Sequence, residues 1–111
     1  MLEETVVGDG LDPPSPMGPL ANVRQQQRLQ AMVVETRAAG ATVREFGRRH
    51  DATTWDDGCF EPSKLVTEIP VDARLVVDEQ FGPVLPIVAF DANAKALALA
   101  NGTPFGLTGS V

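Results

Sequence analysis

An apolar run followed by a short helical pattern places the strongest limit on what this chain can fold into. Residues 84–90 are apolar nearly throughout, which is typical of a strand covered on both faces. Asp91 can cap a helix over 92–100, and residues 107–111 return to a strand pattern. A strand, a helix and a second strand predict a βαβ unit over 84–111, with parallel strands and a right-handed crossover. The pattern favours an α/β protein with a partial parallel sheet.

The clearest single element is a helix expected over residues 23–39. Asn22 is a good N-cap, and Gln25 three residues later completes an Asn-x-x-Gln capping box. Gly40 can take the left-handed conformation that ends a helix. One face of this helix carries residues suited to burial at helical spacing, namely Leu29, Met32, Val33 and Thr36. The sequence therefore predicts an amphipathic helix whose stripe faces a core.

The remaining segments divide by composition into loops and short strands. Residues 1–21 are an expected loop leader, because four prolines and three glycines gather within 8–19. The other divisions are a helix and strand (22–46), a loop-rich segment (47–83) and the βαβ unit (84–111). Short strands are expected at 41–46, at 65–69 and, from the alternation of Ala73, Leu75 and Val77, at 73–77. In the βαβ unit, Pro86 interrupts the first expected strand, because proline prefers strand edges and bulges. Its helix is expected to turn Ala94, Leu97 and Ala98 toward the interior.

Composition and charge remove several classes of function. A formal net charge of −6 over 111 residues makes nucleic acid or an anionic membrane surface a poor partner. The sequence has no run of about 18 apolar residues, so no transmembrane helix is expected. The acidic N-terminus lacks the apolar stretch of a signal peptide. One cysteine and one histidine cannot form an intrachain disulfide or a zinc site, so no metal site is expected. We therefore expect one domain, in the cytoplasm.

The most informative stretch reads Asp-Glu-Gln-Phe-Gly-Pro-Val over residues 78–84. It resembles the Glu-x-Phe-Gly-Pro-Val motif of the aldehyde dehydrogenase superfamily. Three further stretches are similar to that family in the same order: a Gly-Asp loop with Met-Gly-Pro-Leu (8–12 and 17–20), Glu-Pro-Ser (61–63), and Ala-Asn-Gly-Thr-Pro-Phe-Gly-Leu (100–107). On these stretches the chain resembles the superfamily over nearly its whole length.

This resemblance implies the NAD(P)⁺-dependent oxidation of an aldehyde to a carboxylic acid. In the family, a cysteine thiolate attacks the carbonyl, hydride passes to the nicotinamide, and water hydrolyses the thioester. The motif implies that the carboxylate of Glu79 accepts hydrogen bonds from the hydroxyls of the nicotinamide ribose. It likewise implies that Phe81 packs beside that ribose and ring. The plainer interpretation of Glu79 is a solvated acidic residue before a strand.

The departures from the family are as informative as the matches. The family's nucleophilic cysteine, its general-base glutamate and its Rossmann-type half have no counterpart in this sequence. The resemblance therefore implies an internal fragment of the catalytic domain, with no catalytic residue, inactive alone and without tight binding of NAD or NADP. A slice of a sheet leaves an edge and an apolar face uncovered, so we expect a homo-oligomer or marginal folding. The alternative is a non-enzymatic α/β association module derived by truncation.

Other residues that suggest chemistry have plainer explanations. Cys59 has no base at a recognisable spacing and is expected to be a partly buried, unreactive thiol. His50 is expected at the surface, and the acidic pair at 56–57 in a solvated turn. Gly8-x-Gly10 lacks the third glycine and the strand–helix context of a dinucleotide fingerprint. Trp55 is expected to anchor a loop by covering apolar surface.

Overall fold

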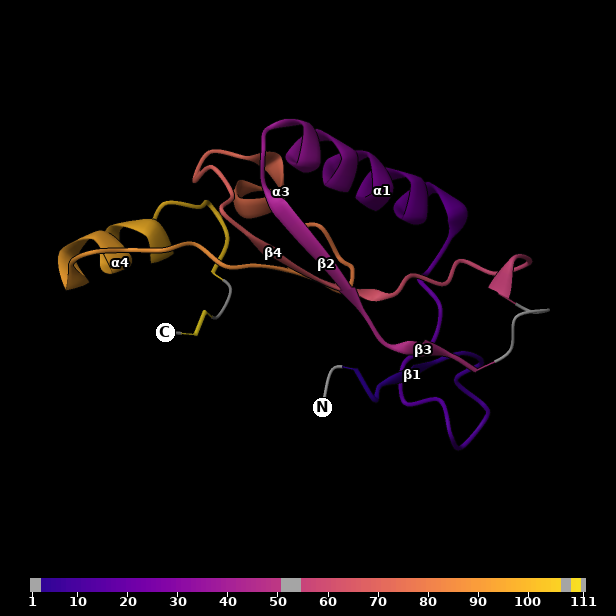
Figure 1. Ribbon diagram of the computed structural model, residues 1–111. Coiled ribbons are helices and arrows are strands. Elements are labelled where there is room, and N and C mark those ends of the chain that lie inside the picture. The colour runs from indigo at the N-terminus through magenta and orange to yellow at the C-terminus, as the bar shows by residue number, and fades with distance from the viewer. Residues whose placement is uncertain (1–2, 51–54, 107–108, 111) are drawn as a thin grey trace.

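A long helix lying on a small sheet forms the body of the protein. The computed structural model describes residues 3–50, 55–106 and 109–110. Helix α1 (Val23–Ala38) lies across one face of the sheet, and the one-turn helix α3 (Arg74–Val77) lies beside it (Figure 1). None of the described helices is both long and apolar enough to cross a membrane.

The sheet is mixed and has three strands. In spatial order these are β2 (Thr42–Phe46), β4 (Ser63–Thr67) and β5 (Val84–Pro86). β2 and β4 pair antiparallel, whereas β4 and β5 pair parallel with Leu65 opposite Leu85. Beyond the C-terminal end of β2, the strands β1 (Val6–Val7) and β3 (Arg48–Arg49) form a separate parallel pair. The α/β class with parallel strand pairing is confirmed.

The principal core lies between α1 and the sheet. The helix buries the predicted stripe, and Thr36 satisfies its hydroxyl by donating to the Met32 carbonyl at 2.7 Å. Met32 and Val66 are completely buried. The residues that pack in this core are Leu29, Met32, Val33, Ala41, Val66, Ile69, Leu75 and Val84. Residues of α1, β4, α3 and β5, together with Ala41 and Ile69, thus share one apolar interior.

The ends of α1 follow the prediction with one exception. The Asn22 side-chain oxygen accepts from the Gln25 backbone N–H at 2.9 Å, and Gly40 has φ +93°. The predicted capping box is nevertheless only half made. The Gln25 side chain donates to the backbone of residues 80 and 81 instead of returning to Asn22. A long-range partner has replaced the local one.

A second, smaller cluster lies near the β1–β3 pair. Val7, Trp55 and Phe60 are buried together, with Met17 packed against them. The Trp55 and Phe60 rings stack with centroids 5.4 Å apart. Trp55 therefore covers apolar surface, as predicted. Because Val7 belongs to β1, the prediction that residues 1–21 are entirely loop is wrong: a two-residue strand is stabilised there by pairing with β3.

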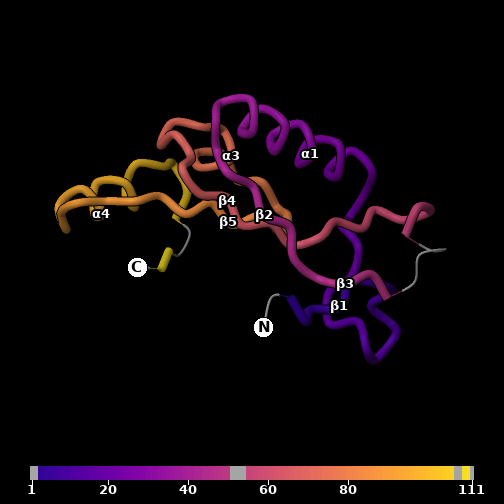
Figure 2. Tube along the Cα trace, viewed as in Figure 1, coloured from indigo at the N-terminus to yellow at the C-terminus, as the bar shows by residue number. Residues whose placement is uncertain are grey.

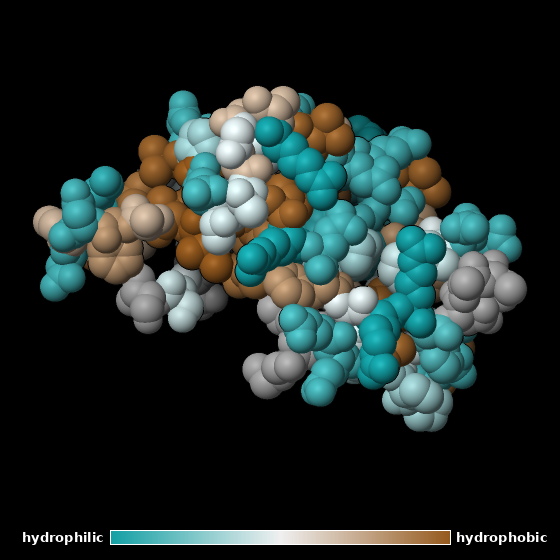
Figure 3. Space-filling model, viewed as in Figure 1, coloured by the Kyte–Doolittle hydropathy of each residue, from teal (hydrophilic) through white to brown (hydrophobic). Residues whose placement is uncertain are grey.

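Helix α4 (Asn93–Ala100) belongs to an arm that projects away from this body (Figures 1 and 2). It has no buried residue, and Leu97, predicted to face inward, is 65% exposed. The Cα radius of gyration is 15.2 Å, against about 13 Å for a compact domain of this size. In Figure 3, brown apolar surface gathers between α1 and the base of this arm.

Three local predictions in the second half are wrong. Residues 73–77 are not extended: the Val77 N–H donates to the Ala73 carbonyl at 3.1 Å in α3, and an alternation of three residues cannot exclude one helical turn. The strand expected at 84–90 ends at Pro86, which has no N–H for the ladder. It is also not covered on both faces, because Leu85 is 60% exposed.

The start of α4 also differs from expectation. Ala92, not Asp91, is the N-cap, and it makes no side-chain cap hydrogen bond. Asp91 instead lies 3.8 Å from the ammonium of Lys95. The strand expected at 107–111 falls largely outside the described residues. The parallel pairing that the structure shows is between β4 and β5, so the crossover through α4 stays a prediction.

Candidate functional site

The motif residues 79–83 form the loop that joins α3 to β5. Asp78 ends α3, and its N–H donates to the Arg74 carbonyl at 2.8 Å. At the other end, the Pro83 carbonyl accepts from the Lys64 N–H of β4 at 2.8 Å. Both ends of the loop are therefore fixed by secondary structure.

The middle of the loop is held by the first half of α1. The Gln25 side-chain amide donates to the carbonyl of Gln80 and, at 3.3 Å, to that of Phe81. One turn further along, the Arg28 guanidinium donates to the Glu79 carbonyl at 3.1 Å. Three consecutive carbonyls of the loop thus accept hydrogen bonds from two helical side chains.

Charge adds to this contact at Asp78, the residue before the loop. The Asp78 carboxylate lies 3.7 Å from the Arg28 guanidinium and 3.4 Å from that of Arg74. Arg74 also reaches the Glu35 carboxylate of α1 at 3.1 Å. These groups are roughly 40 to 50% exposed, so their contribution to stability is small.

The loop also supports itself internally. The Gln80 side-chain oxygen accepts from the Gly82 N–H at 2.7 Å, and its amide donates to the Val84 carbonyl at 2.8 Å. Gly82 lies directly against α1: a Cβ built there would be 2.5 Å from Leu29 Cδ2. A side chain at position 82 would push the loop from the helix, so the glycine of the motif has a packing role.

The two predicted cofactor residues differ from their surroundings because their side chains are available. Phe81 adopts φ +48°, a region that L-residues rarely occupy, and is 69% exposed. The Glu79 side chain is half-buried, and no described residue forms an ion pair or hydrogen bond with its carboxylate. A fixed backbone therefore carries a carboxylate that can accept two hydroxyl donors and an aromatic face two residues away.

A buried ion pair lies on the neighbouring strand. The Lys64 ammonium is 2.8 Å from the Glu61 carboxylate, and both side chains are only 6% exposed. The other carboxylate oxygen accepts from the Gln30 amide at 2.5 Å, and Lys64 also donates to the Pro62 carbonyl. The Glu-Pro-Ser stretch of the family resemblance thus has a structural role in this chain.

The remaining candidates from the sequence lie away from the motif loop. His50 is exposed and lies 3.2 Å from the Asp12 carboxylate. Cys59 has a free thiol and is half-buried, and its backbone carbonyl accepts a hydrogen bond from the Leu20 N–H. A Cβ on Gly8 would be 2.6 Å from His50 Cβ, which gives that glycine a packing role. Within the described ranges, no three His, Cys, Asp or Glu side chains gather as a metal site.

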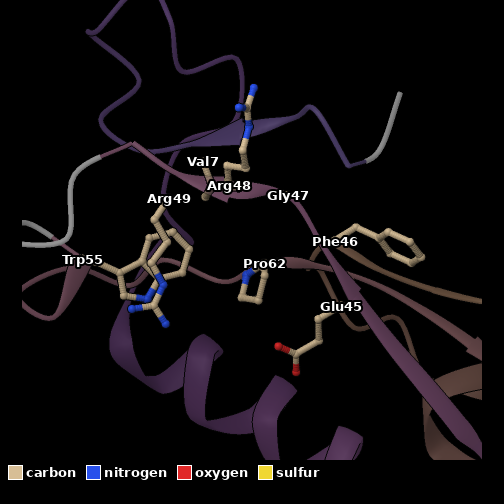
Figure 4. Close-up of a pocket in the computed structure, with 8 residues that line it drawn as sticks. All are labelled: Val7, Glu45, Phe46, Gly47, Arg48, Arg49, Trp55 and Pro62. Carbon is tan, nitrogen blue, oxygen red and sulfur yellow. The ribbon is translucent and has the colours of Figure 1, made fainter.

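Concave surface among the described residues also lies away from the motif loop. A hollow of about 170 Å³ opens beside β3, where the Arg49 guanidinium lies over the Trp55 ring at 4.5 Å (Figure 4). In that view Arg48 and Phe46 point away from this pair. The hollow is lined by Val7, Glu45, Phe46, Gly47, Arg48, Arg49, Trp55 and Pro62. None of these residues belongs to the motif loop.

Sequence reasoning found the motif but missed what holds it. The sequence predicts only a local capping box for Gln25 and indicates no partner for Arg28. Their loop partners lie more than 50 residues away along the chain. The available signal was spacing: positions 25, 28, 29 and 32 share one face of α1, and two of these residues are polar.

Comparison with known proteins identifies the class. The whole chain, residues 1–111, matches the aldehyde dehydrogenase family. It is 40% identical over 97 residues to 3,6-anhydro-alpha-L-galactose dehydrogenase of Streptomyces coelicolor, covering 87% of this chain and 20% of that protein. It is 38% identical over 106 residues to the NADP(+) succinate-semialdehyde dehydrogenase of Mycobacterium leprae, covering 96% and 22%.

Solved structures agree with these relatives. A 3,6-anhydro-L-galactose dehydrogenase in complex with NADP superimposes with a TM-score of 0.82 at 31% identity, covering 92% of this chain and 21% of that one. Betaine aldehyde dehydrogenase from Staphylococcus aureus in complex with NAD⁺ gives a TM-score of 0.79 at 31% identity, covering 91% and 20%.

The chain therefore belongs to the aldehyde dehydrogenase family, a family of NAD(P)-dependent oxidoreductases. It spans about a fifth of the length of the relatives that it matches. The resemblance predicted from four short stretches is confirmed, and so is the prediction that the chain represents only part of the family's sequence.

Proposed function

We propose that residues 79–81 form part of the nicotinamide-ribose site of a dehydrogenase that oxidises an aldehyde to a carboxylic acid with NAD⁺ or NADP⁺. The observation that supports this most directly is the motif loop, whose backbone is fixed while the Phe81 ring is exposed and no described residue forms an ion pair or hydrogen bond with the Glu79 carboxylate. The cofactor supplies the hydride acceptor. Glu79 accepts from the two ribose hydroxyls, and Phe81 shields one side of the sugar and ring from water.

Substitution of Glu79 in a complete dehydrogenase carrying this segment tests the proposal. An amide at this position keeps the size of the side chain but loses a charged acceptor. Glu79→Gln should slow single-turnover hydride transfer and raise the KM for the cofactor, together about tenfold or more, since hydrogen bonds to charged groups are the stronger ones. Glu45→Gln is the matched control, because Glu45 lies on β2 and pairs with Arg37. Unchanged kinetics in the Glu79 variant would refute the assignment.

We further propose that the 111-residue chain by itself neither oxidises aldehydes nor binds NAD or NADP tightly. Two contacts to one ribose cannot offset the several kcal/mol of rigid-body freedom that a ligand loses on binding. Calorimetry with either cofactor should show no binding in the micromolar range, and an aldehyde panel should stay at background. Turnover that disappears with Cys59→Ser would contradict this proposal.

The second candidate is an association module, supported by the uncovered apolar side chains of β5 and the arm. The exposed large residues there are Leu85, Ile87, Phe90, Leu97 and Phe105. We propose that the chain forms a homo-oligomer that buries them and has no nucleic-acid or membrane partner. Light scattering should show more than one copy per particle, and the melting temperature should rise with concentration. A monomer at every concentration would contradict it.

The proposed location is the cytoplasm. A single free cysteine fits a reducing compartment. The net charge of −6 disfavours binding to anionic membrane surfaces. Fractionation of cells that express the protein at its natural level should recover it with cytoplasmic markers; recovery with membranes would contradict this.

A further inference from the structure

We infer that the protein binds a small aromatic carboxylate in a hollow between α1 and β3, where the Arg49 guanidinium holds the carboxylate group. None of the residues that line this hollow belongs to the motif loop 79–83. The inference therefore does not depend on the proposed contacts of Glu79 and Phe81 with a cofactor.

The hollow has two adjoining parts. The part beside β3 measures about 170 Å³, and the part between α1 and the segment 55–64 measures about 410 Å³. Both parts are lined by Glu45, Arg49, Trp55 and Pro62, so Arg49 lies where they adjoin. Pockets for small ligands commonly measure about 300–1,000 Å³, and a molecule with a single ring fits a space of this size.

Arg49 is held in place but has no acidic partner. The His50 N–H, next along the chain, donates to the Val7 carbonyl at 2.9 Å and fixes the backbone of β3 at this point. The Arg49 guanidinium lies over the Trp55 ring at 4.5 Å (Figure 4). Among the described residues, no carboxylate forms an ion pair with it. A guanidinium that stacks on an aromatic ring keeps its planar fork of donors, which matches both oxygens of a carboxylate.

The charge balance of the larger part favours an anion with one charge. Its other charged side chains neutralise one another: Arg37 lies 3.2 Å from Glu45, and Lys64 lies 2.8 Å from Glu61. The Arg49 guanidinium is therefore its one uncompensated charge among the described residues. A polyanion would meet repulsion from the net charge of −6, whereas a monocarboxylate meets a matching partner.

The walls beside the guanidinium favour a ring on that carboxylate. Val33 and Val34 of α1 face the hollow together with Phe60 and Pro62. Val34 is 64% exposed, so α1 presents an uncovered apolar side chain here. Phe60 is buried and stacks with Trp55. A flat aromatic group buries a large apolar area at low cost in conformational freedom, which a short aliphatic acid cannot do.

The preceding residue of β3 provides a matched control. Arg48 lines only the smaller part of the hollow, and in Figure 4 its side chain points away from the Arg49–Trp55 pair. Arg49→Gln and Arg48→Gln each remove one positive charge from adjacent positions. General attraction of anions would fall equally in both variants, but only the first removes the group that binds the carboxylate.

The first measurement is an NMR titration of the 111-residue chain with benzoate, which observes the guanidinium Nε–H signals. Benzoate should shift the Arg49 signal until it saturates and leave the Arg48 signal nearly unchanged. Arg49→Gln should weaken benzoate binding about tenfold or more, followed through the backbone amides of β3, since hydrogen bonds to charged groups are the stronger ones. Arg48→Gln should stay within about twofold of the unsubstituted chain. The absence of a saturable shift, or equal losses in both variants, would overturn the proposal.

Three further probes separate the ring from the charge. Acetate has the carboxylate without the ring, benzyl alcohol has the ring without the charge, and inorganic phosphate is an anion of another shape. Each should bind at least about tenfold more weakly than benzoate. Phosphate binding as tight as that of benzoate would contradict recognition of an aromatic carboxylate. A shift of the Arg49 signal with protein concentration alone would show that a second copy fills the hollow, and the proposal would then be wrong.

The comparison is repeated in a complete dehydrogenase carrying this segment, where the flanking sequence supports the fold. Saturation transfer observed on benzoate measures its binding to the enzyme. Other carboxylate sites contribute equally to the Arg49→Gln and Arg48→Gln variants, because both leave the motif loop unchanged. Binding should fall in the Arg49 variant alone, and equal binding in the two variants would refute the site.

Discussion

Helices α1 and α4 differ in what their apolar side chains touch. The sixteen residues of α1 bury a continuous stripe against the sheet and carry a side-chain N-cap. The eight residues of α4 have neither a buried position nor a side-chain cap. Isolated helices shorter than about 12–15 residues are marginal in water. The comparison teaches that α1 is supported by its own cap and by the core beneath it, whereas the stability of α4 depends on what packs against it.

The two lysine–carboxylate pairs should give the largest contrast. Lys64→Ala leaves the Glu61 carboxylate buried without its counter-ion, which typically costs about 3–5 kcal/mol. Lys95→Ala removes a pair whose carboxylate is 82% exposed, and its effect should stay within about 0.5 kcal/mol. Urea unfolding of both variants measures the difference. Similar losses would mean that the arm is as well packed as the core.

Two leucine truncations compare the apolar faces directly. Leu29 is 1% exposed and Leu97 is 65% exposed. Leu29→Ala should lower the free energy of unfolding by about 2–5 kcal/mol, through lost burial and the cavity left behind. Leu97→Ala should change it by less than about 0.5 kcal/mol in the monomer. A larger loss for Leu97 that grows with protein concentration would locate an interface on α4.

Two glycines test how closely each region is packed. Gly82→Ala places a methyl group 2.5 Å from Leu29 and should cost about 1–3 kcal/mol from overpacking. Gly106→Ala meets nothing within 4 Å and should be nearly neutral. Thermal unfolding suffices as the measurement. If Leu29→Ala suppresses the loss in Gly82→Ala, the close contact is its cause.

The helix caps should give the smallest contrast, with opposite signs. Asn22→Ala removes the acceptor for the Gln25 N–H and should cost about 0.5–2 kcal/mol. Ala92→Ser supplies a cap where none exists and should raise the helical signal of the arm by circular dichroism. Because α4 has no buried residue, this gain should hardly change the urea midpoint of the core. A shifted midpoint would show that arm and core unfold together.

Local rules predicted the elements whose causes are local. Asn22, the spacing of Leu29, Met32 and Val33, and Gly40 define α1 within the sequence itself. Pro86 likewise indicated an interruption of the strand expected at 84–90, and the strand ends at that residue. The helix α3 could not be distinguished from a strand, since one turn with the single buried residue Leu75 has no period to measure.

The candidate site likewise contains one part that the sequence predicts and another that it does not. A contiguous motif identified Glu79 and Phe81, because their resemblance is carried by neighbouring residues. The hydrogen bonds of Gln25 and Arg28 to the loop could not be predicted, because the two segments meet only after the chain has folded. The buried Glu61–Lys64 pair could not be predicted either, because charged side chains are mostly exposed and only the fold shows that both of these are buried.

Trp55 gives the molecule a built-in optical probe. It is the only tryptophan of the chain and lies in the small cluster with Val7 and Phe60, beneath the Arg49 guanidinium. The principal core under α1 contains no tryptophan. Indole emission therefore reports the environment at the β1–β3 end, while far-ultraviolet ellipticity is dominated by α1. Superimposable denaturation curves from the two signals would indicate one cooperative unit, and displaced curves would give each cluster its own midpoint.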